Sequence, residues 1–106
     1  MKMFFGSIPA LITPFNNYNV DYDSLNNIIN HSISSGSNGL VPCGTTGESP
    51  TLSHDEHQKI IEETIRITDK RVPVIAGTGS NNTAEAIDYT KHAEKSGANA
   101  ALVVTP

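Results

Sequence analysis

An apolar run meets a turn rich in glycine and threonine within residues 40–49, Leu-Val-Pro-Cys-Gly-Thr-Thr-Gly-Glu-Ser. Gly44 and Gly47 permit a positive φ and let backbone amides approach a ligand with no Cβ in the way. Successive N–H groups in such a turn form a concavity that suits an anion, and the hydroxyls of Thr45 and Thr46 add donors beside it. The turn is therefore a candidate pocket for a carboxylate or a phosphate. The alternative is a tight strand-to-helix turn that binds nothing.

The same succession of apolar run, polar turn and amphipathic segment repeats along the chain. Short apolar runs bounded by glycine, proline or polar residues are typical of buried strands. We expect residues Asn16–Asp23 to form a loop, because Asn and Asp hydrogen-bond their own backbone in turns. The sequence predicts strands over Ile8–Ile12, Gly39–Cys43, Val72–Ala76 and Ala101–Thr105.

Helical periodicity marks three segments between these strands. The first begins near Leu25 and ends near Gly36, a plausible C-terminal cap. The second begins at Ser53, which with Glu56 forms a capping box that stabilises by about 1 kcal/mol. The third spans about 83–96, followed by a glycine. The faces expected to point inward carry Leu25, Ile28, Ile29, Ser32 and Ile33 in the first helix, His57, Ile60, Ile61, Thr64, Ile65 and Thr68 in the second, and Ala86, Ile87, Thr90 and Ala93 in the third.

The resulting order is β-α-β-α-β-α-β. Continuous apolar strands separated by amphipathic helices indicate a parallel sheet covered by helices. The segments that follow the strands carry the glycines, hydroxyls and amides, whereas the segments that lead into strands are plainer. Parallel α/β proteins bind ligands at the carboxyl ends of their strands. This placement favours a ligand pocket at residues 44–49 over a plain turn.

Composition narrows the function classes. The 106-residue chain has a formal net charge of −4, and its pI near 5.4 argues against nucleic acid and anionic membranes as partners. Its apolar runs are too short to cross a bilayer, and residues 1–8 lack the features of a secretory signal. Cys43 is the only cysteine, so it forms no internal disulfide and is expected to be a buried small hydrophobe. These features fit a cytoplasmic protein.

Four strands without a closing partner leave two unpaired edges, which is an aggregation hazard in an independent domain. We therefore interpret residues 1–106 as the first half of a single (β/α)₈ barrel catalytic domain, a TIM barrel of about 250 residues, whose C-terminal half is missing.

Several motifs together resemble the dihydrodipicolinate synthase family, also called 4-hydroxy-tetrahydrodipicolinate synthase, over essentially the whole chain. The Gly-Thr-Thr-Gly-Glu element marks the wider superfamily of pyruvate-dependent Schiff-base aldolases, which includes N-acetylneuraminate lyase. Ser53–His57 together with Asn81–Glu85 is more specific to the synthase. The resemblance rests on Gly6–Ile8, Leu11–Phe15, Gly44–Ser49, Leu52–His57, Val74–Gly79 and Thr83–Ile87.

The resemblance implies a carbon–oxygen lyase that condenses pyruvate with aspartate semialdehyde in the diaminopimelate route of lysine biosynthesis, with no cofactor. Thr45 would match the threonine of a catalytic proton relay, and Thr46, with the backbone at Gly44, would hold the pyruvate carboxylate. None of the five lysines lies at an apolar strand end, where the Schiff-base lysine is expected. The chain alone is therefore expected to be inactive. The family also implies a homotetramer.

His54 and His57 stand three residues apart at the start of the second helix and share a face. A metal site would need more ligands, so none is predicted. A solvated helix start remains one reading. The resemblance implies another, a binding site for L-lysine as an allosteric inhibitor, formed by Ser49, Pro50, His54, His57, Asn81 and Glu85.

Three alternatives stay open. One is another pyruvate-dependent aldolase or lyase such as N-acetylneuraminate lyase. Another is a flavodoxin-like βα module that binds phosphate, although Gly77–Asn82 lacks both the third glycine of a dinucleotide fingerprint and the Gly-Lys of a P-loop. The third is a non-catalytic half-barrel that associates with another chain.

Overall fold

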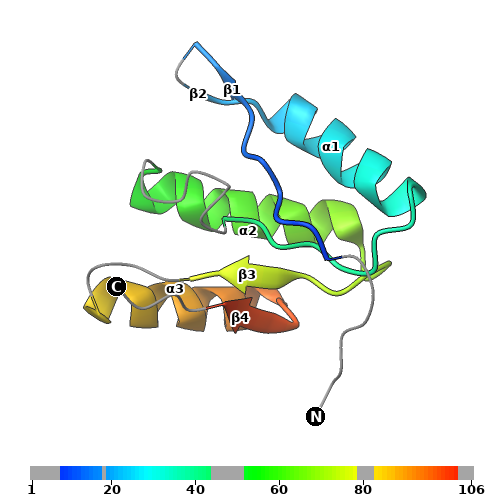
Figure 1. The fold of residues 1–106 in the computed structure, drawn as a ribbon. Helices are drawn as coiled ribbons and strands as arrows, with labels where there is room; N and C mark the ends of the chain where they lie inside the picture. Colours follow the sequence, from blue (N-terminus) through cyan, green and yellow to red (C-terminus); the bar gives the residue numbers. More distant parts are fainter. Residues whose placement is uncertain (1–7, 18, 44–51, 79–82, 103–106) are drawn as a thin grey trace.

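The computed structural model describes residues 8–17, 19–43, 52–78 and 83–102. Three helices and four short strands make up this part of the chain (Figure 1). None of the described helices combines the length and apolarity that a membrane crossing needs. The elements are β1 (Phe15–Asn16), β2 (Asn19–Val20), α1 (Tyr22–Ser34), α2 (His54–Thr68), β3 (Ile75–Gly77), α3 (Thr83–Ser96) and β4 (Ala100–Leu102).

Parallel pairing links four segments in the order in which they occur along the chain. Ala10 pairs with Val41, Leu40 pairs with Val74, and β3 pairs with β4 in the register Ile75↔Ala100. The alternating parallel α/β order predicted from the sequence is thereby confirmed. A flavodoxin-like sheet would place its first strand between the second and the third. Here the segment around Leu40 lies between the first and third segments instead, which contradicts the flavodoxin-like alternative.

The first three strands are shorter than the apolar runs predicted: the segments at Ala10 and Leu40 make only isolated bridges, and β3 occupies Ile75–Gly77. The described part of the fourth strand is Ala100–Leu102, and residues 103–105 of its predicted range lie outside the described residues. The neighbouring segments are nevertheless joined by backbone hydrogen bonds. The Leu11 N–H donates to the Val41 carbonyl at 2.9 Å, and the Ile75 N–H donates to the Leu40 carbonyl at 2.8 Å.

The loop expected over Asn16–Asp23 was predicted wrongly in part. β1 and β2 form an antiparallel hairpin in which Phe15 pairs with Val20. Asn17 takes a positive φ of 50° at its turn, a conformation that asparagine tolerates better than most residues. Asp21 then caps α1 by accepting a hydrogen bond from the Ser24 N–H at 3.0 Å. The Asn- and Asp-rich composition thus supplies a hairpin turn and a helix cap.

The predicted start of α2 and the predicted glycine ends of α1 and α3 are confirmed, whereas α1 begins at Tyr22, earlier than the predicted start near Leu25. The Ser53 hydroxyl accepts from the Glu56 N–H at 3.1 Å, and the Glu56 carboxylate accepts from the Ser53 N–H at 2.9 Å, which completes the capping box. Gly36 and Gly97 have φ values of 97° and 101°. The residue after each glycine donates its N–H to a carbonyl five residues earlier: Ser37 donates to Ser32, and Ala98 donates to Ala93. This hydrogen bond is typical of a Schellman motif.

The core lies between the parallel segments and the helices, where α1 packs against α2 and α2 against α3. One predicted inward position is wrong: Ile87 is 49% exposed, whereas Tyr89 is only 5% exposed. The buried face of α3 passes through Tyr89 and Ala93, because the tyrosine ring fills the space above α2. The main core cluster consists of Leu11, Val20, Leu25, Ile29, Leu40, Cys43, Ile60, Ile61, Ala76 and Ala93.

Candidate functional site

The sequence-predicted site residues divide into two groups. His54, His57 and Glu85 lie on the first turns of α2 and α3. Figure 1 shows the N-terminal ends of these helices on the same side of the molecule as the carboxyl end of β3. The structure thus brings the three residues to the side where ligands are expected. The other predicted residues lie outside the described part of the chain: Gly44, Thr45, Thr46, Ser49, Pro50 and Asn81.

His57 is buried, with 1% of its surface exposed, and it contacts the carboxyl end of β3. Its Nε2 lies 2.8 Å from the carbonyl oxygen of Gly77. Because a carbonyl oxygen only accepts, Nε2 carries the hydrogen and Nδ1 is left with a lone pair. Nδ1 is buried and has no hydrogen-bond partner among the described residues. Burial lowers the pKa of His57 to about 4, so the imidazole is neutral at physiological pH.

Tyr89 is a site residue that the sequence reasoning missed. Its ring stacks on His57, with centroids 3.8 Å apart and planes inclined by 17°, and on His54 at 4.9 Å and 28°. Burial, followed by the charge of Glu85, raises the pKa of Tyr89. One signal could have revealed it: Tyr89 follows Glu85 by four residues, so the two share a face of α3.

His54 differs from His57 in being exposed at the first position of α2. The side-chain amide of Gln58 donates to the Nε2 of His54 at 3.0 Å, which leaves Nε2 as the acceptor. Glu85 is partly buried, and its charge acts on the pKa values of both His57 and Tyr89. An exposed imidazole, aromatic rings and a carboxylate thus gather at one seam between α2 and α3. Such a set suits an organic ammonium.

Farther along this seam, His92 on α3 lies 2.5 Å from the carboxylate of Glu62 on α2. This contact joins the two helices beyond the stacked rings. Within the described ranges, no group of three or more histidine, cysteine or carboxylate side chains could hold a metal ion.

The chain turns sharply immediately before residues 44–49. Cys43 has a φ of 58°, in the left-handed region, and is 3% exposed. Burial raises the pKa of its thiol to about 12, so it is a poor nucleophile. The expectation of a buried cysteine is confirmed. The neighbouring Pro42 carbonyl accepts from the Gly77 N–H at 2.9 Å, which places the end of this segment beside the end of β3.

The hydroxyls beyond β3 are also ordered. Thr78 is fully buried, and its N–H donates to the Leu102 carbonyl at 3.0 Å. Thr90 on α3 donates its hydroxyl to the Thr78 hydroxyl at 3.0 Å. The carboxyl ends of three parallel segments are therefore linked to one another and to α3.

Comparison with known proteins gives a consistent result. Residues 3–106 match the model of the "Dihydrodipicolinate synthetase family". The chain is 62% identical over 105 residues to the 4-hydroxy-tetrahydrodipicolinate synthase of Rhizobium meliloti, covering 98% of this chain and 36% of the relative. It is 60% identical over 104 residues to the same enzyme of Roseobacter denitrificans, again covering 98% of this chain and 36% of the relative.

A solved structure agrees in fold as well as in sequence. The chloride-inhibited dihydrodipicolinate synthase of Acinetobacter baumannii, in complex with pyruvate, matches with a TM-score of 0.94 at 50% identity. The match covers 98% of this chain and 36% of that one. The chain therefore spans little more than a third of the length of the relatives it matches.

Proposed function

Because this chain belongs to the dihydrodipicolinate synthetase family, we propose that the whole protein is a 4-hydroxy-tetrahydrodipicolinate synthase. It condenses pyruvate with aspartate semialdehyde, as a carbon–oxygen lyase of lysine biosynthesis. The observation that carries this proposal is the identity of 57–62% to synthases over nearly the whole chain. The proposal extends to a cytoplasmic homotetramer, which rests on the resemblance alone.

In this proposal pyruvate forms a Schiff base with a lysine from the part of the protein beyond these residues. Thr46 and the backbone at Gly44 hold the substrate carboxylate, and Thr45 passes a proton. Support comes from the sharp turn at Cys43, which lies at the carboxyl end of a parallel segment. The pyruvate complex of the Acinetobacter relative supports a keto acid as the ligand.

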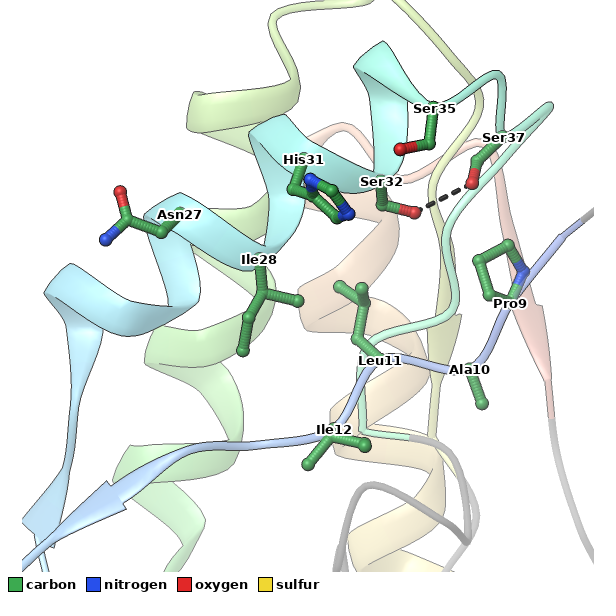
Figure 2. A pocket seen from close by; sticks show the side chains of 10 residues that line it. All are labelled: Pro9, Ala10, Leu11, Ile12, Asn27, Ile28, His31, Ser32, Ser35 and Ser37. Carbon is green, nitrogen blue, oxygen red and sulfur yellow. Dashed lines mark hydrogen bonds between the residues drawn. The ribbon is translucent and has the colours of Figure 1, made fainter.

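We also propose that residues 1–106 form the first half of a (β/α)₈ barrel. The parallel segments follow chain order, as they must in a barrel. Among the described residues, the segment 9–12 pairs on one side only, with the segment around Val41. Ile12 is 65% exposed, and a groove of about 610 Å³ lies between this segment and α1. Figure 2 shows Leu11 and Ile12 facing Ile28 and His31 across it. In the whole barrel the closing strand and helix cover this groove.

Activity and adduct formation test the proposed reaction. The whole protein should turn over pyruvate and aspartate semialdehyde, and borohydride should trap a pyruvate adduct on it. Residues 1–106 expressed alone are the matched control and should give neither signal. Cleavage of N-acetylneuraminate to pyruvate and N-acetylmannosamine, without turnover of aspartate semialdehyde, would support the related lyase and contradict the synthase. A pyruvate adduct on residues 1–106 would contradict the assignment of the Schiff-base lysine.

A second proposal concerns regulation. The structure gathers His54, His57 and Glu85 at one seam, which favours the lysine site over a plain solvated helix start. We propose that L-lysine binds there and inhibits the synthase, with Glu85 facing its ammonium group. Ser49, Pro50 and Asn81 complete the site in this proposal. A synthase whose rate does not change at saturating L-lysine would contradict it.

A further inference from the structure

Tyr89 joins two histidines whose surroundings differ. His57 is held by burial and by its bond to the Gly77 carbonyl, whereas His54 is exposed at the start of α2. An exposed side chain loses rotamer freedom when a ligand binds, and this loss lowers the affinity for the ligand. The His54 ring already has two partners in this structure, the face of Tyr89 and the amide of Gln58.

We infer that Tyr89 is a positioning residue: its ring, anchored on His57, holds the imidazole of His54 in place at the seam between α2 and α3. A ligand that binds at this seam then meets an imidazole that is already ordered. The identity of that ligand as lysine rests on the regulation proposed above, whereas the placement of His54 does not.

The anchoring follows from the geometry of the stack. The Tyr89 ring is 5% exposed and lies closest to His57, whose own position is fixed by β3. Tyr89 therefore cannot shift without disturbing the core, and it offers His54 a fixed aromatic face. Aromatic pairs contribute about 0.5–1.5 kcal/mol beyond area burial, so removing this face should weaken binding at the seam about two- to tenfold.

The test uses the whole protein as wild type and with Tyr89→Phe, which keeps the ring, or Tyr89→Leu, which removes it. Diethyl pyrocarbonate acylates accessible imidazoles, and peptide mass spectrometry measures the rate at each histidine. Free N-acetylhistidine, added to every reaction, serves as the reference. Relative to this reference, His54 should react at least about twofold faster in Tyr89→Leu and at the wild-type rate in Tyr89→Phe. Equal rates in wild type and Tyr89→Leu would overturn the inference.

Lysine inhibition provides the second measurement. The half-inhibitory concentration should rise about two- to tenfold in Tyr89→Leu and should return to the wild-type value in Tyr89→Phe. Equal half-inhibitory concentrations in wild type and Tyr89→Leu would overturn the claim that Tyr89 strengthens ligand binding at the seam. If lysine does not inhibit the wild type, the regulatory proposal fails, and the acylation rates still decide the placement of His54. Tyr89→Met replaces the leucine variant in both measurements if that variant does not fold.

Discussion

The imidazole Nε2 of His57 lies 2.8 Å from the carbonyl oxygen of Gly77, and this bond ties the first turn of α2 to the carboxyl end of β3. The same imidazole supports the Tyr89 ring at 3.8 Å. One buried side chain therefore connects α2, β3 and α3 on the side where ligands are expected.

His57 predicts a pH dependence of stability. Its pKa is about 4 in the folded protein and about 6.5 when unfolded, so the unfolded state binds more protons between these values. Stability is therefore complete above about pH 6.5 and falls as the pH drops toward 4, by up to roughly 3 kcal/mol.

The measurement is thermal unfolding of the whole protein at pH 7.5 and at pH 4.5. The matched variant is His57→Gln, whose amide keeps a donor for the Gly77 carbonyl but does not titrate in this range. The wild type should lose more stability than the variant on acidification. Equal losses would show that His57 does not contribute to the pH dependence.

The capping box predicts that the Ser53 hydroxyl contributes to the stability of the protein. Replacing Ser53 with alanine leaves the Glu56 N–H without its acceptor and should destabilise the protein by about 1 kcal/mol. Glu56→Gln is the matched control, because glutamine also completes a capping box. Urea unfolding of the two variants measures the difference. The capping role would be contradicted if Ser53→Ala were as stable as Glu56→Gln.

Two isoleucines show how the cost of one substitution depends on whether the side chain is buried. Ile29 is fully buried, whereas Ile87 is 49% exposed. Ile29→Ala should cost about 2–5 kcal/mol because it removes buried methyl groups and leaves a cavity. Ile87→Ala makes the same chemical change on the surface and should cost within about 0.5 kcal/mol. Denaturant unfolding distinguishes them, and a large loss for Ile87→Ala in the whole protein would indicate that another element covers this position there.

If Thr46 holds the substrate carboxylate as proposed, removing its hydroxyl should weaken the binding of pyruvate. A hydrogen bond to a charged group contributes about 1.5–3 kcal/mol, so Thr46→Val should lower kcat/KM for pyruvate roughly 10- to 100-fold. Lys95→Ala, at the exposed last turn of α3, is the control and should match the wild type. Steady-state kinetics at saturating aspartate semialdehyde provide the comparison. A Thr46→Val enzyme with unchanged kcat/KM would remove Thr46 from the carboxylate site.

The local features of the fold followed directly from the amino-acid order. The capping box at Ser53 and Glu56 and the left-handed glycines at Gly36 and Gly97 depend on residues within five positions of one another. The alternation of apolar runs and amphipathic helices also predicted the parallel α/β order correctly. Backbone hydrogen bonding and helical periodicity act over this short range, so a sequence displays them without knowledge of neighbouring elements.

The contacts between helices could be identified only from the tertiary structure. Helical periodicity placed Ile87 on the inward face of α3 and left out Tyr89, whereas the actual rotation of α3 about its axis buries Tyr89 and exposes Ile87. That rotation depends on how the rings of His54 and His57 on α2 fit against α3, which is a contact between side chains 32 or more residues apart in the sequence. The sequence by itself determined the capping box that starts α2 and the glycines that end α1 and α3. The packing of α2 on α3 decided which side chains form the candidate site, because shape and solvation at that seam depend on both helices at once.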